Sequence, residues 1–485
     1  MGVTNPRFDL AAPVPAWDRL GAVHLLAIGG AGMSAVARLL LSRGVTVSGS
    51  DAADGPVLEA LRQAGATVHV GHDPAHLGSA DTVVVSSAIR EDNPELAAAR
   101  AAGLLVLHRA QALAALTAGR RGVAVAGANG KTTTTAMLTV ALAAAGADPS
   151  FACGGEIPQL GTNAAVGDGP AFVVEADESD GTFVVYRPEI GVVTTVQPDH
   201  LDFYGTAEAV TDAYREFAAT IADGGLLVAS ADDPGARSLA EQERARGRRV
   251  VTFGRAEDAD LVVVSTAEEG LATRTVLRDR GVPRTLDLAV PGDHNVANAC
   301  AAHLVAVEGL GLDPEAVLAG LAGFTGVRRR FEVRGEVDGV TVVDDYAHNP
   351  AKVAAVVAAA AGVVRRAGTG RVLVVFQPHL YSRTRDFAEA FARALAPADL
   401  VLVLDVFGAR EDPVPGVGPD LVATPLAGLA GERTVVSGPS REDAVDRLVA
   451  AAGPGDLVLT VGAGDVTRLG PPILEGLRAR TGATP

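Results

Sequence analysis

The stretch that most constrains this chain runs from Gly122 to Thr135, where an apolar strand passes through a glycine-rich turn into a helix. Glycines in such a turn let backbone N–H groups converge on phosphate oxygens, and the helix N-terminus adds its positive dipole end. A lysine there reaches the β- and γ-phosphates, and a following threonine hydroxyl binds Mg²⁺. We therefore expect a nucleoside triphosphate to contact Gly127, Ala128, Asn129, Gly130, Lys131, Thr132 and Thr133.

This turn is shorter than the full Walker pattern, which has a glycine where this chain has Val125. The alternative is a strand-to-helix turn that carries a lysine by chance. The chain contains two lysines, Lys131 and Lys352, and uses arginine almost everywhere else. Since arginine does not replace lysine at such a site, the retained Lys131 favours phosphate binding.

Length and charge narrow the class of protein. A chain of 485 residues is too long for one core and indicates about three domains. The net charge of −17 argues against a surface for nucleic acid or anionic membrane. Two cysteines provide no disulfide framework or metal cluster, and the N-terminus has no signal-peptide pattern, so we expect a cytoplasmic protein. The apolar run 353–364 is too short to span a bilayer and predicts an alanine-rich helix.

An earlier glycine turn resembles a dinucleotide fingerprint. A strand ends at Ala27, which takes the place of the first glycine, and Gly29 to Ser34 begin a helix. The next strand ends in Ser50 and Asp51, about 20 residues further along, as in the fingerprint. Such a turn either binds a nucleotide-type ligand or simply packs a helix on a sheet. Further strand–helix units follow, including one that ends near Ser87.

Acids and histidines follow the strands of the middle region. The strand before Glu175 runs into an acidic cluster, where phosphate-loop folds place a second partner of Mg²⁺; the alternative is a solvated acidic loop. His200 is either a neutral metal ligand or a structural residue. We expect residues 154–163 to form a loop and residues 260–288 a small antiparallel appendage.

The last part of the chain again alternates strands and helices. His294, Asn295 and Asn298 lie within about one helical turn, where they either read an adenine edge or cap a helix. The run 328–330 consists of three arginines, which indicates either an anion contact or a solvated surface. Ligands in open α/β sheets lie beyond the carboxyl ends of the strands. Four residues that can line one cleft fall there: Tyr346, His348, His379 and Arg383.

Taken together, these motifs resemble the Mur ligases, the ATP-dependent ligases of peptidoglycan precursor synthesis. The blocks at 29–34, 127–134, 175–180, 199–202, 294–298, 329–331, 344–348 and 376–385 occur in the family's order and cover about residues 23–470. The blocks at 175–180 and 376–379 resemble the alanine-adding member. The resemblance implies an α/β fold of three domains: a Rossmann-like UDP-binding domain at 1–118, an ATPase domain with a parallel sheet at 119–327, and a Rossmann-like domain for the amino acid at 328–485.

The resemblance also implies a reaction. The carboxylate of UDP-N-acetylmuramate attacks the γ-phosphate of ATP, and the amine of L-alanine then displaces phosphate from the acyl phosphate. It implies two Mg²⁺ ions, with Mn²⁺ as a substitute, and a monomer or weak homodimer that inserts into no membrane. Such a ligase supports cell-wall biogenesis, and so cell shape and division.

The resemblance assigns roles residue by residue. Lys131, Glu175, His200, His348 and Arg383 are expected in catalysis, and Thr132, Glu175 and His200 as metal ligands. The nucleotide is also expected to meet His294, Asn295, Asn298, Arg329, Arg330 and Asp345. The UDP group is expected to meet Gly29, Gly30, Ala31, Gly32, Met33, Ser50, Asp51, Ser87, Ala88 and Ile89. Alanine is expected to meet Tyr346, His348, His379 and Arg383.

The chain departs from the family pattern at three places, and three other functions remain open. Before the retained His200, the residues Thr195-Val-Gln-Pro-Asp199 stand where the family often has Asn-Ile-Glu-Ala-Asp. Ala128-Asn129 stands where the family often has Thr-His, and Leu380 where it often has arginine, which leaves Arg383 or Arg385 to contact the anion. The alternatives are a Mur-type ligase for another amino acid or a recycled peptide, a nicotinamide-dependent dehydrogenase, and a non-catalytic nucleotide-binding regulator. The dehydrogenase does not explain Lys131 and Thr132.

Overall fold

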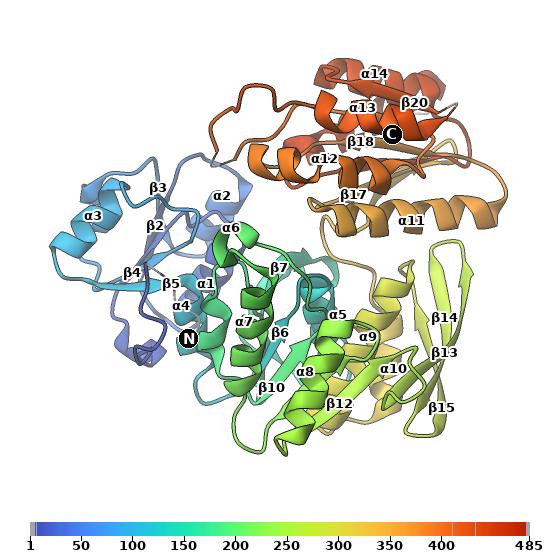
Figure 1. Ribbon diagram of the computed structural model, residues 1–485. Coiled ribbons are helices and arrows are strands. Elements are labelled where there is room, and N and C mark those ends of the chain that lie inside the picture. Colours follow the sequence, from blue (N-terminus) through green and yellow to red (C-terminus); the bar gives the residue numbers. More distant parts are fainter. Residues whose placement is uncertain (1–4, 6, 410, 432, 482–485) are drawn as a thin grey trace. The chain divides into compact units, whose positions relative to one another are not determined.

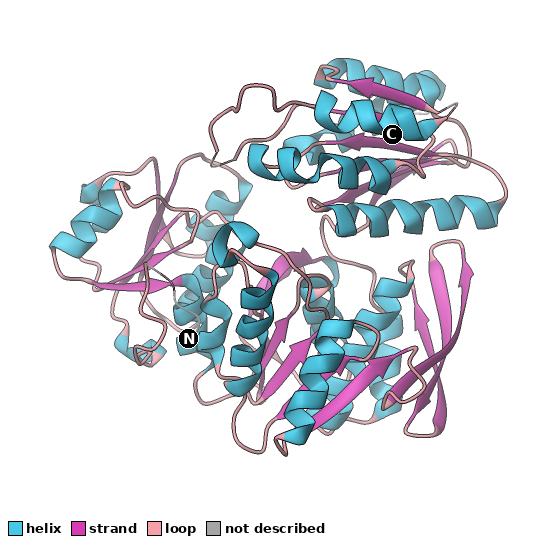
Figure 2. Cartoon of the chain, viewed as in Figure 1, coloured by secondary structure: helices cyan, strands magenta, loops and turns pink. Residues whose placement is uncertain are grey.

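A computed structural model describes residues 5, 7–409, 411–431 and 433–481. Within these residues the chain forms three sheets with helices packed on them (Figures 1 and 2), which confirms the predicted α/β class. No helix in the described part of the chain is both long and apolar enough to cross a bilayer.

The first sheet has the strand order β3-β2-β1-β4-β5, and all its pairings are parallel. Its strands are β1 Val23–Leu26, β2 Val47–Asp51, β3 Thr67–Val70, β4 Thr82–Val85 and β5 Leu105–His108. Its helices are α1 Ala31–Ser42, α2 Pro56–Gln63, α3 Pro94–Ala101 and α4 Arg109–Thr117. The central strands β1 and β4 are buried throughout, as their largely apolar sequences require when helices cover both faces.

The second sheet has the order β15-β14-β13-β12-β11-β10-β6-β9-β7-β8. Its strands are β6 Arg121–Ala126, β7 Ser150–Ile157, β8 Thr162–Ala165, β9 Ala171–Glu175, β10 Ile190–Val193, β11 Leu226–Ser230, β12 Arg249–Gly254, β13 Leu261–Glu269, β14 Ala272–Asp279 and β15 Val282–Leu288. The helices are α5 Lys131–Ala144, α6 Leu201–Tyr204, α7 Ala207–Ala219, α8 Pro234–Ala245, α9 Asp293–Leu304 and α10 Pro314–Ala322. Strands β12, β11, β10, β6 and β9 pair in parallel, which places the ends of β6 and β9 at one edge.

Two segments of this sheet differ in how well the sequence predicted them. The appendage is confirmed, because two-residue connections join β13, β14 and β15 and such short turns require antiparallel neighbours. The predicted loop at 154–163 is wrong, because most of it belongs to β7 and β8, which pair antiparallel around a bulge. The glycines of this segment suggested a loop, but Gly154 lies in strand β7. The residue is glycine because a Cβ at this position would overlap the Glu175 carboxylate.

The third sheet has the order β16-β17-β21-β18-β19-β20, and only the β16–β17 pair is antiparallel. Its strands are β16 Glu332–Val337, β17 Val340–Asp345, β18 Val372–Phe376, β19 Leu400–Val403, β20 Thr434–Ser437 and β21 Leu457–Val461. Its helices are α11 Pro350–Ala367, α12 Tyr381–Leu395, α13 Asp420–Ala430, α14 Arg441–Ala451 and α15 Gly470–Thr481. Helix α11 contains the predicted alanine-rich helix.

The chain divides into two compact units. The first unit comprises Met1–Thr266, Arg274–Leu288 and Asn295–Thr325, and it holds the first sheet and most of the second. The second comprises Ala267–Thr273, Ala289–His294 and Gly326–Pro485, and it holds the third sheet.

Candidate functional site

The phosphate loop joins β6 to α5 in the first unit. Gly127 and Gly130 have φ values of +137° and +85°, in the left-handed region that residues with a Cβ rarely adopt. A side chain at Gly127 would overlap Thr194, and one at Gly130 would overlap Asn298. Both glycines are therefore required by backbone conformation and by close packing, as the sequence predicted for this turn.

The residues that follow β10 fix the shape of the loop. The N–H groups of Ala128 and Asn129 donate to the carbonyl and hydroxyl oxygens of Thr195, at 3.1 and 3.0 Å. The Thr194 hydroxyl donates to the Asn129 carbonyl at 2.5 Å. Because these two loop N–H groups are used internally, the donors that face a phosphate are those of the first turn of α5, which lack intrahelical partners.

Lys131 reaches back over this loop and meets a buried acid. Its Nζ donates to the Gly127 carbonyl at 2.8 Å and to both carboxylate oxygens of Glu178 at 2.7 and 2.9 Å. Glu178 is 2% exposed and Lys131 12%. Burial lowers the pKa of Lys131, but the neighbouring carboxylates, foremost Glu178, raise it by more than burial lowers it. The net pKa lies above the usual lysine value, so the ammonium is charged at neutral pH.

Thr132 and Glu175 converge beside this pair. The Thr132 hydroxyl donates to the Glu175 carboxylate at 3.0 Å, and the Gly154 N–H donates to its other oxygen at 2.8 Å. Hydroxyl and carboxylate oxygens suit Mg²⁺, which needs only one or two protein ligands besides phosphate oxygens and water. Within the described residues no group of three or more His, Cys, Asp or Glu forms a ready-made metal site. The oxygen pair of Thr132 and Glu175 thus fits Mg²⁺ as a partner of bound phosphate.

His200 also lies near Glu178. Its Nε2 is 3.8 Å from a Glu178 oxygen and 3.9 Å from an Asp199 oxygen. Its backbone is left-handed, with φ +54°, at the start of α6. A non-glycine residue in this conformation carries a modest strain that the surrounding structure must hold. The strained turn keeps the imidazole beside the acids, and the structure thereby brings Lys131, Thr132, Glu175 and His200 together.

The acids after β9 face two directions. Glu175 and Glu178 face the phosphate loop, whereas Asp177 accepts from Arg109 of α4 at 3.3 Å. Asp180 lies against His108 Nε2 at 3.2 Å and accepts a short hydrogen bond from the Ser87 hydroxyl.

Both aspartates are anionic. Burial raises the pKa of Asp177, but the charges of Lys131 and Arg109 lower it to about 2. Burial likewise raises the pKa of Asp180, and hydrogen bonds, first that of His108, bring it well below the usual range. One acidic segment therefore serves the phosphate loop and also holds residues of the first sheet.

The first glycine turn has the geometry of a helix N-terminus open to an anion. Ala27 has φ +62°, so this alanine adopts a conformation suited to the glycine that begins the dinucleotide fingerprint. The N–H groups of Gly29 and Gly30 are used internally, by the Asp51 carboxylate at 2.9 Å and the Ala27 carbonyl at 3.1 Å. The remaining donors are those of Ala31, Gly32 and Met33, at the start of α1.

The other residues predicted to meet the UDP group differ in exposure. Ser50 is fully buried and donates to Glu95 at 2.5 Å, while its oxygen lies 3.0 Å from His72. Ser87 and Ala88 are exposed, and Ile89 is buried beneath them. Asp51 is half-buried and caps the glycine turn.

Helix α9 carries the three residues predicted to meet the adenine side. His294 is exposed, whereas Asn295 and Asn298 are buried. Asn298 accepts from the Thr134 hydroxyl at 3.2 Å and lies directly against Gly130. The structure thus places Asn298 beneath the phosphate loop, which it supports, and His294 at the surface.

In the second unit, Arg329 and Asp345 are held by their own backbone surroundings. Arg329 donates to the carbonyls of Gly462 and Gly464 at 2.8 and 3.0 Å. Asp345 accepts from the N–H groups of Phe331 and Ala347, both at 2.7 Å. Burial raises the pKa of Asp345 to about 6, although nearby Arg330 lowers it.

The residues predicted to meet the amino acid form one cluster in the second unit. The rings of His348 and His379 are 5.9 Å apart, and Arg383 lies 3.4 Å from Nδ1 of His379. His348 Nδ1 donates to the Tyr346 carbonyl at 3.0 Å, which leaves Nε2 as an acceptor. Burial, followed by the charges of Lys352 and Arg383, keeps the pKa of His348 well below its usual range. The cluster offers a cation and a neutral acceptor.

Leu380, at the position where the family often has arginine, has a φ of +70° and is buried. Arg385 lies on the exposed face of α12 and pairs with Asp386 at 2.7 Å. Among the described residues Arg383 has no carboxylate partner. Of the two arginines considered for the anion contact, Arg383 is therefore the one that lies in the cluster.

Two residues of the first-unit site were missed by sequence reasoning. Glu178 belongs to the acidic cluster that the sequence flagged, but spacing alone did not show that it, besides Glu175, meets the phosphate loop. Arg109 follows β5 directly, and its position at a strand end was the available signal.

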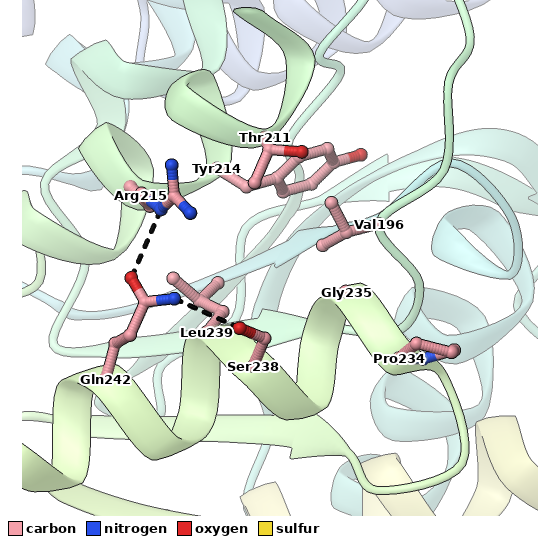
Figure 3. A pocket seen from close by; sticks show the side chains of 9 residues that line it. All are labelled: Val196, Thr211, Tyr214, Arg215, Pro234, Gly235, Ser238, Leu239 and Gln242. Carbon is pink, nitrogen blue, oxygen red and sulfur yellow. Dashed lines mark hydrogen bonds between the residues drawn. The ribbon is translucent and has the colours of Figure 1, made fainter. Parts of the chain in front are cut away.

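A pocket of about 290 Å³ lies between α7 and α8 (Figure 3). Gln242 bridges its wall by bonds to Arg215 and Ser238, both at 3.1 Å. The lining residues are Val196, Thr211, Tyr214, Arg215, Pro234, Gly235, Ser238, Leu239 and Gln242. None of the predicted site residues lines this pocket, so it is separate from the phosphate loop.

Three family models match successive parts of the chain. The model described as "Mur ligase family, catalytic domain" matches residues 22–121, "Mur ligase middle domain" matches 125–306, and "Mur ligase, glutamate ligase domain" matches 329–464.

Named relatives span nearly the whole chain. The UDP-N-acetylmuramate–L-alanine ligase of Kineococcus radiotolerans is 58% identical over 97% of this chain and 99% of its own. The enzyme of that name from Arthrobacter is 56% identical over 95% of this chain and 96% of its own.

Solved structures share the fold. UDP-N-acetylmuramate–alanine ligase from Thermotoga maritima superimposes with a TM-score of 0.79 at 28% identity, over 95% of this chain and 99% of that one. A murein peptide ligase from Psychrobacter arcticus gives 0.70 at 24% identity, over 94% of this chain and 98% of that one. The resemblance seen in the motifs and the three-domain α/β fold are confirmed, and this chain belongs to the Mur ligase family.

Proposed function

We propose that this protein is an ATP-dependent ligase that joins L-alanine to the carboxylate of UDP-N-acetylmuramate, with release of ADP and phosphate. The observation that carries this proposal is the convergence of Lys131, Thr132, Glu175 and Glu178 at the phosphate loop. Relatives named UDP-N-acetylmuramate–L-alanine ligase, which match 97% and 95% of the chain, support the proposal. The reaction belongs to peptidoglycan precursor synthesis and would take place in the cytoplasm.

The three domains expected from the sequence, 1–118, 119–327 and 328–485, are proposed to hold UDP-N-acetylmuramate, ATP and L-alanine respectively. The first turn of α5 and the Lys131 ammonium would bind the β- and γ-phosphates. Thr132 and Glu175 would hold Mg²⁺, with His200 beside a second ion, and the metal would supply positive charge to the phosphates. Transfer of a phosphoryl group needs this charge neutralisation and alignment more than covalent help.

The proposed reaction has two steps, and neither step requires an oxidant or a reductant. A muramoyl carboxylate oxygen attacks the γ-phosphorus, the bond to the β-phosphate oxygen breaks, and ADP leaves. The amine of L-alanine then attacks the acyl carbon, and phosphate leaves with the former carboxylate oxygen.

The second unit offers groups that suit alanine. Arg383 would bind the amino-acid carboxylate, because a guanidinium binds a carboxylate through paired hydrogen bonds. The Nε2 of His348 can accept a hydrogen bond from the incoming amine, since the imidazole is neutral. For the nucleotide, Asn298 would support the phosphate loop from below. His294, Asn295, Arg329, Arg330 and Asp345 stay predicted contacts of ATP.

A ligase for another amino acid or for a recycled peptide remains the nearest rival, and one structural neighbour is a murein peptide ligase. The test is ATP-dependent phosphate release with UDP-N-acetylmuramate and L-alanine, D-glutamate or a tripeptide in turn. We expect L-alanine to give the highest kcat/KM. A preference for D-glutamate or the tripeptide would overturn the proposal. The expected monomer or weak homodimer can be checked by sedimentation.

A further inference from the structure

Arg109 is a cation beside the first glycine turn, and the proposed function assigns it no role. It is the first residue of α4, and its side chain lies against the glycine turn at the start of α1. A Cβ at Gly32 would overlap the Arg109 guanidinium, so the glycine makes room for this arginine. The Arg109 side chain is 25% exposed, which leaves part of it accessible to a ligand.

The first glycine turn also has backbone N–H donors without a partner among the described residues, at the start of α1 next to Arg109. The N–H groups of Gly29 and Gly30 already have partners within the protein. The first N–H groups of α1, from Ala31 to Met33, have no carbonyl acceptor within the helix. The Arg109 guanidinium therefore lies beside the N-terminus of α1, and both groups favour binding of a phosphate.

Asp177 holds the guanidinium in this position from the second sheet. The Arg109 Nη2 donates to Asp177 at a rather long 3.3 Å, and the Ser179 N–H donates to the other Asp177 oxygen at 3.1 Å. This pairing involves one guanidinium nitrogen, and an arginine carries five N–H donors. Asp177 thus orients Arg109 without using all its hydrogen-bonding capacity.

We propose that Arg109 binds the diphosphate of the UDP substrate and that Asp177 is the positioning residue that aims it. The inference rests on the proposed function, because it assumes that the first glycine turn receives a UDP group. It adds to the expected contacts a side chain whose task is the diphosphate, distinct from the groups that meet the uridine. Asp177 follows Glu175 by two residues, so the contact also ties the UDP site to the ATP-facing acids.

The experiment measures binding of UDP and of uridine by calorimetry to wild-type protein and to Arg109→Ala. Loss of charge-assisted hydrogen bonds is expected to weaken UDP binding by about tenfold or more. Uridine has no phosphate, so its affinity should stay unchanged. The ratio of the two affinities within one variant does not depend on how much of the sample is folded. Arg109→Lys keeps the charge but loses the planar donor pair, and its ratio should be intermediate.

Arg100→Ala is the matched control, because Arg100 lies in helix α3, which packs with the first sheet, and also pairs with a carboxylate, Glu91. Its UDP-to-uridine ratio should equal the wild-type ratio. Asp177→Asn should lower the ratio less than Arg109→Ala. In the Arg109→Ala background Asp177→Asn should have no further effect, since its role acts through the arginine. A purely structural Asp177 would instead change both affinities equally in either background.

The outcomes separate the inference from the proposed function. If wild-type protein binds UDP and Arg109→Ala keeps the wild-type ratio, the role of Arg109 is wrong while the ligase proposal stands. If wild-type protein binds neither UDP nor uridine, the proposed function fails and this inference with it. In steady-state assays Arg109→Ala should raise the KM for UDP-N-acetylmuramate and leave the KM for ATP unchanged.

Discussion

The pairing of Lys131 with Glu178 makes a prediction in which stability and activity separate. Lys131→Met removes the ammonium but leaves Glu178, 2% exposed, without its main partner. Breaking a buried ion pair on one side costs about 3–5 kcal/mol, because an uncompensated charge stays buried. For a domain of about 200 residues, that corresponds to a fall of roughly 6–20 °C in the thermal midpoint.

The double variant Lys131→Met/Glu178→Gln tests the origin of this loss. A neutral amide in place of the carboxylate removes the buried charge, so most of the midpoint should return. Turnover should not return, because the phosphates still lack the lysine. The assays are calorimetric unfolding and phosphate release, both measured on the single variants and the double variant.

Arg248→Met provides a matched control in the same unit. Arg248 pairs at 2.8 Å with the fully buried Glu243, far along the chain from the phosphate loop. Glu243 also pairs with Arg246 at 2.6 Å, so its charge stays partly compensated and the loss of stability should be smaller than that of Lys131→Met. Arg248→Met should lower the midpoint and keep its turnover at temperatures below the transition. A wild-type midpoint for Lys131→Met would refute the buried-pair reasoning, and normal turnover of the double variant would refute the role of Lys131.

Three further predictions concern other parts of the chain. Burial raises the pKa of Asp345 to about 6, so the folded state favours its protonated form. Protonated Asp345 therefore contributes to the free energy of unfolding fully below about pH 4, and this contribution of about 3 kcal/mol is lost as the pH rises through 6. Asp345→Asn should therefore flatten the decline of the thermal midpoint between pH 4 and 7, and an unchanged slope would contradict the assignment. Ala27→Gly relieves a left-handed alanine with φ +62° and should raise the free energy of unfolding of the first unit by about 1 kcal/mol, and with it the thermal midpoint, whereas a lowered midpoint would show no strain there. Arg383→Met should raise the KM for L-alanine by tenfold or more, on the order of a charge-assisted pair, while Arg385→Met should not; equal effects would reject Arg383 as the carboxylate partner.

The sequence predicted the backbone of the site well, because backbone demands appear directly as residue types. Gly127 and Gly130 are glycines since their φ values and close neighbours allow nothing larger. Lys131 is retained in a chain that otherwise uses arginine. The family's motif order also predicted the fold, and the alternating pattern of residues 260–288 predicted the appendage of β13 to β15.

The direction in which side chains point could not be predicted in this way. Glu175, Asp177, Glu178 and Asp180 lie within six residues, and spacing does not reveal that two face the phosphate loop and two face the first sheet. Arg109 gains its importance from Gly32, which is distant in sequence. Part of strand β7 was mistaken for a loop because Gly154 serves close packing against Glu175 and not a turn.

The most direct test of the account is phosphate release with ATP, UDP-N-acetylmuramate and L-alanine all present, compared with each one omitted. Product should be identified by mass spectrometry. The account predicts sustained release, and UDP-N-acetylmuramoyl-L-alanine as product, only when all three substrates are present. Equal release without UDP-N-acetylmuramate, or release without a new amide product, would contradict it.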